Sequence, residues 1–498
     1  MPTLVEIKTT ILDFEKNQDL QFWNYEGMDL WPILRSLVYV ECRNEIHFSE
    51  TGVQLDWKKG KEKSKLRSIL QKFRSHFLDQ KSEDRAKLSF ISDREERDVL
   101  LFGSWYFRTH YEGMFINKFY YPLITFLNQD LKIRALEVEY STHPTYLADY
   151  QRLKGEIDFV ADYPKVGLDQ QRIEYLLDSK LFDAFFTALE GKGVDRKLRI
   201  QIANKVEKIY TDSFVYQAIF QKYNPKFAFC LTFFSEAMFA MIFAASKAGI
   251  TTIDLGHGFP SDKENMIYSK LTNVPIDGYN TLPDIYWVWD VPVKVALEQW
   301  CLRQRKHQVV VGGNPWLEYC SSKIPLQKLS DKNIVLYTLT VSLPEVFVLD
   351  AMKKTEGQYE WWIRLHPSIR GAQSELKSIF NKSSITNFNL SEANTLDLPF
   401  LLKNVDVHIS RNSSSIYESV FLGNTPVILD QEGMEYFDFY LESGQALGLP
   451  QKSPEKLIQM IQTVLDRNTE TEIIDFKYKT AVNFLFKNKK AQKSYLKV

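Results

Sequence analysis

Short apolar strands alternate with helical stretches over most of the sequence. The clearest example predicts a strand over Lys226 to Leu231, a helix over Ser235 to Ala248 and a second strand over Ile250 to Asp254. Strands and helices that alternate in this way form parallel sheets, because each helix returns the chain to the start of the next strand. The sequence therefore predicts the α/β class.

The same alternation begins again in the second half. Strands are expected at Ile334 to Tyr337, Glu360 to Leu365, Val405 to Ser410 and Pro426 to Leu429. At 498 residues the chain is also too long for one hydrophobic core. We therefore predict two successive parallel α/β domains, at residues 86–322 and 323–470, followed by a helical tail at 471–498.

Residues 1–85 predict a helical N-terminal extension. A basic run from Lys58 to Lys65 leads into apolar residues at helical spacing that end at Phe77. Basic amphipathic helices bind anionic lipid surfaces, so residues 58–77 would contact the inner face of the cytoplasmic membrane. The alternative is that these apolar residues pack on the first domain.

Composition and charge argue against several classes of protein. The 62 basic and 63 acidic residues give a net charge of −1, so no global field attracts nucleic acid. The four cysteines lack CxxC spacing, which argues against a disulfide framework or a zinc site. The N-terminus lacks the basic and apolar regions of a signal peptide. We expect a cytoplasmic protein with no metal and no nucleic-acid partner.

Ligands of open parallel sheets bind beyond the carboxyl ends of the strands. In the second predicted domain, three strand ends carry polar residues that should converge on one edge and bind a nucleotide. These residues are Thr338 and Thr340, then His366 and Pro367, then Ser413, Ser414 and Ser415. Arg364, Arg411 and, from the first domain, Asn314 are expected to line the cleft for donor and acceptor.

The serine run is the most informative of these strand ends. It lies between a strand and a helix, and a helix N-terminus offers free N–H groups and positive partial charge that bind phosphate without a metal. The alternative is simple N-capping by Ser413 or Ser414. Glu418, one turn into the helix, favours the phosphate interpretation. Asp430, after the next strand, could touch a sugar or cap a turn, but the favoured interpretation is a solvated loop.

Two histidines follow predicted strands. His366 precedes Pro367, which would end the strand and hold the imidazole at its carboxyl edge; the alternative is a hydrogen-bonded histidine at a strand end. His257 lies between Gly256 and Gly258, which would let the backbone approach a ligand and expose the imidazole. We expect His257 to act as a general base near neutral pH. The alternative is a tight turn with an incidental histidine.

Together these motifs resemble the C-terminal domain of bacterial GT-B glycosyltransferases that build surface polysaccharides. The closest likenesses are the sialyltransferases and Kdo transferases, which use CMP-sugars, and the CDP-glycerol polymerases. The resemblance implies two Rossmann-like domains that face a cleft. It also implies nucleotide contacts at His366 and Pro367, and phosphate contacts at Ser413 to Ser415. Tyr111-Glu112-Gly113 partly matches the acidic motif of sialyltransferases, so Glu112 is the second candidate for the base.

The expected function is therefore metal-independent transfer of a sugar from a nucleotide-sugar to a glycan or lipid-linked glycan. A CMP-linked ulosonic acid is the favoured donor, because a single phosphate needs only one helix N-terminus. Glu418 leaves UDP-sugars open, since an acidic residue on that helix holds the ribose in UDP-sugar enzymes of this fold. Two further alternatives are a sugar-nucleotide epimerase and an inactive scaffold in a polysaccharide assembly complex.

Overall fold

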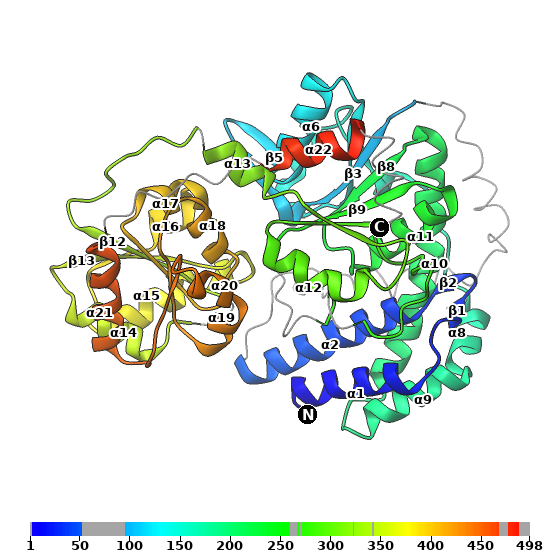
Figure 1. The fold of residues 1–498 in the computed structure, drawn as a ribbon, viewed down its shortest axis with the longest axis horizontal. Coiled ribbons are helices and arrows are strands. Elements are labelled where there is room, and N and C mark those ends of the chain that lie inside the picture. The colour runs from blue at the N-terminus through cyan, green and yellow to red at the C-terminus, as the bar shows by residue number, and fades with distance from the viewer. Residues whose placement is uncertain are drawn as a thin grey trace. The chain divides into compact units, whose positions relative to one another are not determined.

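The computed structural model describes residues 2–51, 95–258, 266–268, 271–321, 323–340, 343–467 and 477–487. These residues form two compact units (Figure 1). The first unit contains the described residues up to 50, then 95–316, then 477–487, and the second contains 317–467. The predicted membrane contact at residues 58–77 lies outside the described residues.

The first unit is built on a seven-stranded sheet in which every pairing is parallel, in the order β11-β10-β9-β8-β3-β6-β7. Its strands are β3 (Val99–Ser104), β6 (Ala135–Ser141), β7 (Asp158–Phe159), β8 (Phe227–Cys230), β9 (Thr251–Leu255), β10 (Ile285–Val288) and β11 (Gln308–Val311). All six residues of β3 are buried, as expected for a central parallel strand that is covered on both faces.

Helices surround this sheet, and two small antiparallel hairpins accompany them. The helices are α1 (Leu4–Asn17), α2 (Trp31–Thr51), α6 (Tyr120–Thr125), α7 (Leu147–Arg152), α8 (Gln170–Leu177), α9 (Lys180–Glu190), α10 (Lys197–Tyr223), α11 (Glu236–Ala248), α12 (Val291–Cys301), α13 (Pro315–Ser321) and α22 (Tyr478–Lys487). The hairpins are β1 (Asn24–Tyr25) with β2 (Met28–Asp29), and β4 (Arg108–Tyr111) with β5 (Met114–Asn117).

Helices α1 and α2 share the main core of the first unit with α10, α11 and the central strands (Figure 1). Trp31, for example, is fully buried and its ring contacts Phe185 of α9 at 5.3 Å between centroids. The predicted helical N-terminal segment is thus an integral part of the first unit in its described residues. The predicted domain boundaries stay predictions.

The second unit contains a six-stranded sheet, again parallel throughout, in the order β14-β13-β12-β15-β16-β17. Its strands are β12 (Asn333–Thr338), β13 (Tyr359–Arg364), β14 (Phe388–Asn389), β15 (Val407–Ser410), β16 (Val427–Ile428) and β17 (Leu447–Gly448). Its helices are α14 (Val346–Lys354), α15 (Gln373–Lys382), α16 (Ser391–Thr395), α17 (Leu398–Asn404), α18 (Ser415–Phe421), α19 (Gln431–Tyr436), α20 (Asp438–Glu442) and α21 (Pro454–Leu465).

The side chains of β12 alternate between two separate cores. Val335 and Tyr337 pack with one apolar cluster, whereas Ile334 and Leu336 pack with another that includes α17. Successive side chains of a strand point to opposite faces, so helices must cover both sides of this sheet. The two sheets confirm the predicted fold class, an α/β protein with two Rossmann-like parallel-sheet domains.

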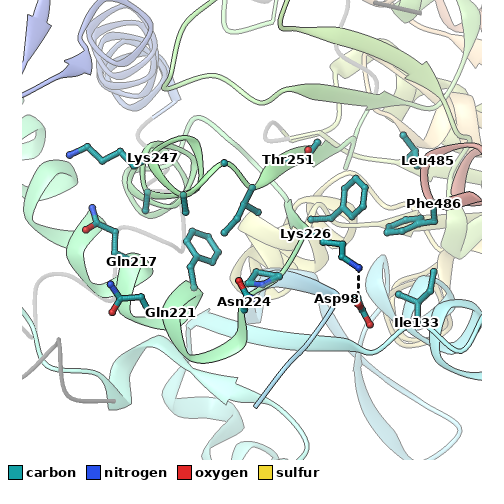
Figure 2. A pocket seen from close by; sticks show the side chains of 17 residues that line it. Asp98, Ile133, Gln217, Gln221, Asn224, Lys226, Lys247, Thr251, Leu485 and Phe486 are labelled. Carbon is teal, nitrogen blue, oxygen red and sulfur yellow. Dashed lines mark hydrogen bonds and ion pairs between the residues drawn. The ribbon is translucent and has the colours of Figure 1, made fainter. Parts of the chain in front are cut away.

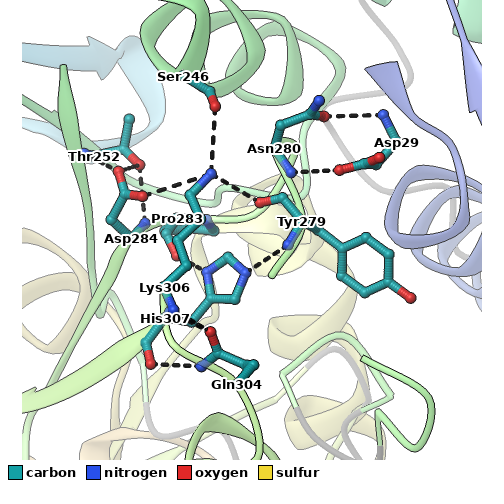
Figure 3. A network of polar contacts seen from close by, with 10 residues as sticks. All are labelled: Asp29, Ser246, Thr252, Tyr279, Asn280, Pro283, Asp284, Gln304, Lys306 and His307. Carbon is teal, nitrogen blue, oxygen red and sulfur yellow. Dashed lines mark hydrogen bonds and ion pairs between the residues drawn. The ribbon is translucent and has the colours of Figure 1, made fainter. Parts of the chain in front are cut away.

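A buried polar network fastens the amino edge of the first sheet (Figure 3). His307 Nε2 accepts a hydrogen bond from the Tyr279 N–H at 2.9 Å, so the proton lies on Nδ1, which donates to the Pro283 carbonyl at 2.6 Å. Gly278 has φ +70°, and a Cβ there would lie 2.5 Å from His307 Nε2. Burial lowers the pKa of His307 to about 3, so the imidazole is neutral.

This histidine should make folding stability depend on pH. Its pKa is about 3 in the folded chain against an ordinary 6.5, so the unfolded state binds more protons between these values. The contribution of His307 to the free energy of unfolding is complete above pH 6.5. It decreases as the pH falls, by up to about 1.4 kcal/mol per pH unit. The free energy of unfolding, measured with urea, should fall less between pH 7.5 and pH 5 in His307→Gln than in the parent. Equal falls in the two proteins would contradict this.

Candidate functional site

The order of strands locates the candidate ligand crevice of the second unit. From β12 the chain builds outward through β13 on one side, and from β15 it builds outward through β16 on the other. A crevice opens at such a switch point, beyond the carboxyl ends of the two adjacent strands. Thr338 ends β12, Ser410 ends β15, and Arg411 begins the turn that leads into α18.

Thr338 and Ser415 lie beneath this crevice. Both are 4% exposed, and their hydroxyl oxygens are 2.8 Å apart. Thr338 Oγ1 also lies 2.8 Å from His408 Nε2 and 3.0 Å from Ser410 Oγ. Both hydroxyls thus take part in an internal network, and the expectation that they contact the nucleotide stays a prediction.

The turn itself presents Asn412, Ser413 and Ser414, all half-buried. Ser413 Oγ accepts a hydrogen bond from the Ser415 N–H at 3.3 Å, so Ser413 helps to hold the turn. Ser414 has helical dihedral angles and its hydroxyl makes no capping hydrogen bond. The capping alternative thus fails for Ser414. Glu418 is half-buried one turn further on.

Arg411, which follows β15, forms ion pairs with carboxylates that follow β16 and β12. Its Nε lies 2.5 Å from Asp430 Oδ2, after β16, and 3.6 Å from Glu345 Oε1, on the segment after β12. Burial alone would lower the pKa of Arg411, but the ion pair with Asp430 outweighs burial and raises it. Arg411 is therefore a permanent positive charge at the crevice.

Asp430 is not part of a solvated loop. Its side chain is 5% exposed, and its Oδ1 accepts a hydrogen bond from the Gly433 N–H at 2.9 Å, which caps α19. A Cβ at Gly433 would lie 2.1 Å from the Arg411 carbonyl oxygen, so only glycine fits there. The alternative that Asp430 caps a turn is therefore the one that the structure supports.

The remaining predicted residues of the second unit have mixed outcomes. His366 is half-buried just beyond β13, at the predicted edge, and Thr340 is half-buried beyond β12. Pro367 begins a short 3₁₀ turn. Arg364, expected in the cleft, instead donates from Nη1 to the carbonyls of Ala393 and Leu396, at 2.8 and 2.6 Å.

In the first unit, His257 follows β9 at the carboxyl edge of the sheet. Its ring contacts those of Phe107 and Phe234, at 5.5 and 6.3 Å between centroids. Its Nδ1 is buried and has no hydrogen-bond partner among the described residues. Burial, with a smaller effect of Lys118, lowers the pKa of His257 to about 4. The imidazole is thus neutral at pH 7 and able to accept a proton.

The glycines beside His257 have different surroundings. Gly256 donates to the Trp287 carbonyl at 2.8 Å and accepts from the Trp289 indole at 2.7 Å. Its backbone therefore braces the sheet, contrary to the expectation that it approaches a ligand. Gly258 is half-buried. Asn314, also expected in the cleft, is buried, and its Oδ1 accepts from the Trp316 N–H at 3.1 Å.

A buried carboxyl lies just before this loop. Asp254 of β9 accepts hydrogen bonds from the Tyr268 hydroxyl at 3.0 Å and from the Phe233 N–H at 3.2 Å. Burial raises the pKa of Asp254 to about 7. The sequence analysis missed this group, although it precedes the Gly-His-Gly motif by two residues.

A second buried charge cluster anchors the β4–β5 hairpin. Arg108 of β4 lies between Glu137 and Glu139 of β6, with N–O distances of 2.7 and 2.8 Å. Burial raises the pKa of Glu139 to about 8 despite the arginine. Glu112 lies at the exposed tip of this hairpin, where it has φ 48°.

A cavity of about 930 Å³ lies at the opposite, amino edge of the first sheet (Figure 2). The first residues of β8 and β9, Phe227 and Thr251, line it, together with Phe486 of α22. Lys226 reaches across to Asp98 at 3.4 Å. None of the predicted site residues lines this cavity, so it is distinct from both carboxyl edges.

The described residues contain neither a cluster of metal-ligand side chains nor a helix suited to span a membrane. No group of three or more His, Cys, Asp or Glu side chains is arranged to hold a metal ion within these ranges. Among the same residues, no helix is both long and apolar enough to cross a membrane.

Comparison with known proteins supports the fold. No protein-family model and no curated protein matches the sequence. A Listeria monocytogenes protein assigned as a UDP-N-acetylglucosamine 2-epimerase is 14% identical, with 79% of this chain and 96% of that chain covered and a TM-score of 0.50. The Neisseria meningitidis UDP-GlcNAc 2-epimerase bound to UDP-GlcNAc is 15% identical over 78% and 100%, with a TM-score of 0.48. The calicheamicin glycosyltransferase CalG4 is 11% identical over 81% and 99%, with a TM-score of 0.44.

At 14% identity and a TM-score of 0.50, the likeness to the Listeria protein supports a shared fold and nothing finer. The capsule, Kdo and sialyl resemblance gains no support from any sequence family.

Proposed function

We propose that this chain is an enzyme that acts on a nucleotide-sugar and binds the nucleotide at the carboxyl edge of the second sheet. The observation that carries the proposal is the half-buried turn from Arg411 to Ser414, which lies at the switch point between β12 and β15. Backbone N–H groups and two serine hydroxyls are suitable partners for phosphate. The guanidinium of Arg411 lies beside them, with its charge partly offset by Asp430 and Glu345.

Uridine is the favoured nucleoside of the nucleotide. Glu418 occupies the helical position at which UDP-sugar enzymes of this fold hold the ribose, and its half-buried side chain is compatible with that role. A CMP-linked ulosonic acid was favoured partly because three serine hydroxyls lie near a helix terminus. One of them, the hydroxyl of Ser415, instead contacts Thr338 Oγ1 at 2.8 Å.

Epimerisation of the sugar is the first candidate reaction. The Listeria protein that shares the fold is assigned to this activity, and this chain spans nearly its whole length. Inversion at a sugar carbon requires a base to remove a proton and an acid to return one. His257 is neutral and able to serve as the base.

Glycosyl transfer to a glycan or lipid-linked glycan is the second candidate, favoured by the Gly-His-Gly sequence after β9. In that reaction His257 would accept the proton of the acceptor hydroxyl, with Glu112 as the other candidate. In both reactions, metal independence stays a prediction.

The two candidates differ in whether nucleotide is released. The chain should be incubated with UDP-GlcNAc, with and without a glycan acceptor, and followed by NMR and by free UDP. An epimerase converts the sugar while UDP stays attached, whereas a transferase releases UDP only with acceptor. A chain that binds UDP-GlcNAc but does neither, under all conditions tried, would point to the inactive scaffold.

Ser414→Ala tests the turn directly. Loss of a hydrogen bond to a charged phosphate should weaken UDP binding by about 1–3 kcal/mol. Isothermal calorimetry with EDTA present measures this, and CMP and CDP are titrated in parallel. Ser443→Ala, at the end of α20, is a matched control that should leave affinity unchanged. Unchanged UDP affinity in Ser414→Ala would remove this serine from the site.

A further inference from the structure

The imidazole of His408 lies inside the second sheet, beneath the proposed nucleotide site. It is fully buried on β15, two residues before the strand ends. Its Nε2 lies 2.8 Å from Thr338 Oγ1, whereas its Nδ1 has no partner among the described residues. A buried imidazole in such a place requires a reason, because an apolar side chain would cost less to bury.

The hydrogen bonds around Thr338 determine which nitrogen of His408 carries the proton. Ser410 Oγ donates to the Thr338 carbonyl at 2.8 Å, and Thr338 Oγ1 donates to Ser410 Oγ at 3.0 Å. With the only proton of the Thr338 hydroxyl directed at Ser410, we assign the His408 proton to Nε2, which donates to Thr338 Oγ1. Its Nδ1 is then a bare lone pair, which is the form that tolerates burial without a partner.

This arrangement holds both ends of the turn from Arg411 to Ser414. Before the turn, Ser410 is bonded to the Thr338 carbonyl. After the turn, Ser415 Oγ lies 2.8 Å from Thr338 Oγ1. One threonine therefore fixes where the turn begins and where it ends, and the His408 N–H fixes the rotamer of that threonine.

We infer that His408 is a positioning residue that acts through Thr338 to hold the turn from Arg411 to Ser414 in the shape that receives the nucleotide phosphate. The inference rests on the proposed function, because it assigns the turn to phosphate. His408 itself touches no ligand, and its effect on binding is transmitted by two hydroxyl groups.

Calorimetry with UDP tests the inference on four variants of the full chain. His408→Leu and Thr338→Val each remove one partner and should weaken UDP binding about 10- to 100-fold, since a displacement near 1 Å costs that much in a positioned site. His408→Gln keeps a donor near the Nε2 position and should bind within about threefold of the parent. His307→Leu removes the buried histidine of the first unit, so it controls for destabilisation alone and should leave affinity unchanged.

Each result decides between defined outcomes. Parent-like affinity in both His408→Leu and Thr338→Val overturns the inference, and Thr338→Val alone decides if His408→Leu does not fold. Equal losses in His408→Leu, His408→Gln and His307→Leu would indicate a structural effect and also overturn it. If the parent binds no UDP, the proposed function fails, and the positioning role fails with it.

NMR of selectively ¹⁵N-histidine-labelled protein supplies an independent readout. The signal lost in His408→Gln should be that of a neutral, Nε2-protonated imidazole at pH 7, and Thr338→Val should shift it. A charged ring or an Nδ1-protonated tautomer would contradict the arrangement, whether or not UDP binds.

Discussion

Replacing His257 with alanine or glutamine should lower turnover by about 100- to 10,000-fold, the usual cost of losing a general base. UDP affinity should stay nearly unchanged, because the nucleotide is proposed to bind the second unit. Steady-state kinetics and calorimetry on the same preparations measure the two effects. His110→Ala, which alters an exposed histidine of the same unit, should keep full activity.

The dependence of the rate on pH tests the same role of His257. Burial holds the pKa of His257 at about 4 in the folded chain, so its base form is already present well below neutral pH. The rate should not fall through protonation of this residue until the pH approaches 4. If the alanine variant keeps more than about a tenth of parental activity, His257 is a loop residue and Glu112 is the next candidate.

Replacing Arg108 with methionine should destabilise the fold by about 3–5 kcal/mol, because it leaves Glu137 and Glu139 buried without a positive partner. Both carboxyls are at most 9% exposed in their side chains. Urea unfolding at pH 7 measures the loss. Arg134 bridges Asp98 and Glu96 on the surface, so Arg134→Met is a matched control that should change stability little.

The loss in Arg108→Met should also depend on pH. A carboxyl whose pKa is raised, as burial raises that of Glu139, binds its proton more tightly in the folded state. Its ionisation therefore favours unfolding as pH rises from the ordinary 4.5. The deficit should be largest at high pH and shrink towards pH 5. The triple variant Arg108→Met, Glu137→Gln, Glu139→Gln should recover most of the loss, and no recovery would contradict the account.

The sequence predicted the parallel strands well where apolar runs end at turn residues. The strand expected at Ile250 to Asp254 is β9 at Thr251–Leu255, and the helix expected at Ser235 to Ala248 is α11 at Glu236–Ala248. Residues 150–220 could not be ordered, because buried and polar residues alternate irregularly along the 27-residue α10. The β4–β5 hairpin was missed, because its turn places Glu112 at a positive φ that Asn, Asp or Gly usually occupies, and only Gly113 signals the turn.

The sequence was sufficient to predict that the candidate site lies at the carboxyl edge of the second sheet. It was not sufficient to predict which side chains are accessible there. The carboxyl-end rule pointed to residues that the structure does place at the ends of β12, β13 and β15, and their role in binding stays a prediction. It could not separate Ser414, on the accessible turn, from Ser415, which points into the interior. That difference depends on which strand lies beside which, here the pairing of Thr338 with Ser410. His408 carries no local signal, because its role depends on a neighbour 70 residues away in sequence.

Calorimetric titration of the parent chain with UDP, in buffer that contains EDTA, is the most direct test of the proposal that the switch-point turn of the second unit binds a nucleotide. The account predicts saturable binding of UDP with one site per chain, weakened in Ser414→Ala and unchanged in His257→Ala. Absence of affinity for UDP, CMP and CDP alike, in a chain that unfolds cooperatively, would contradict it.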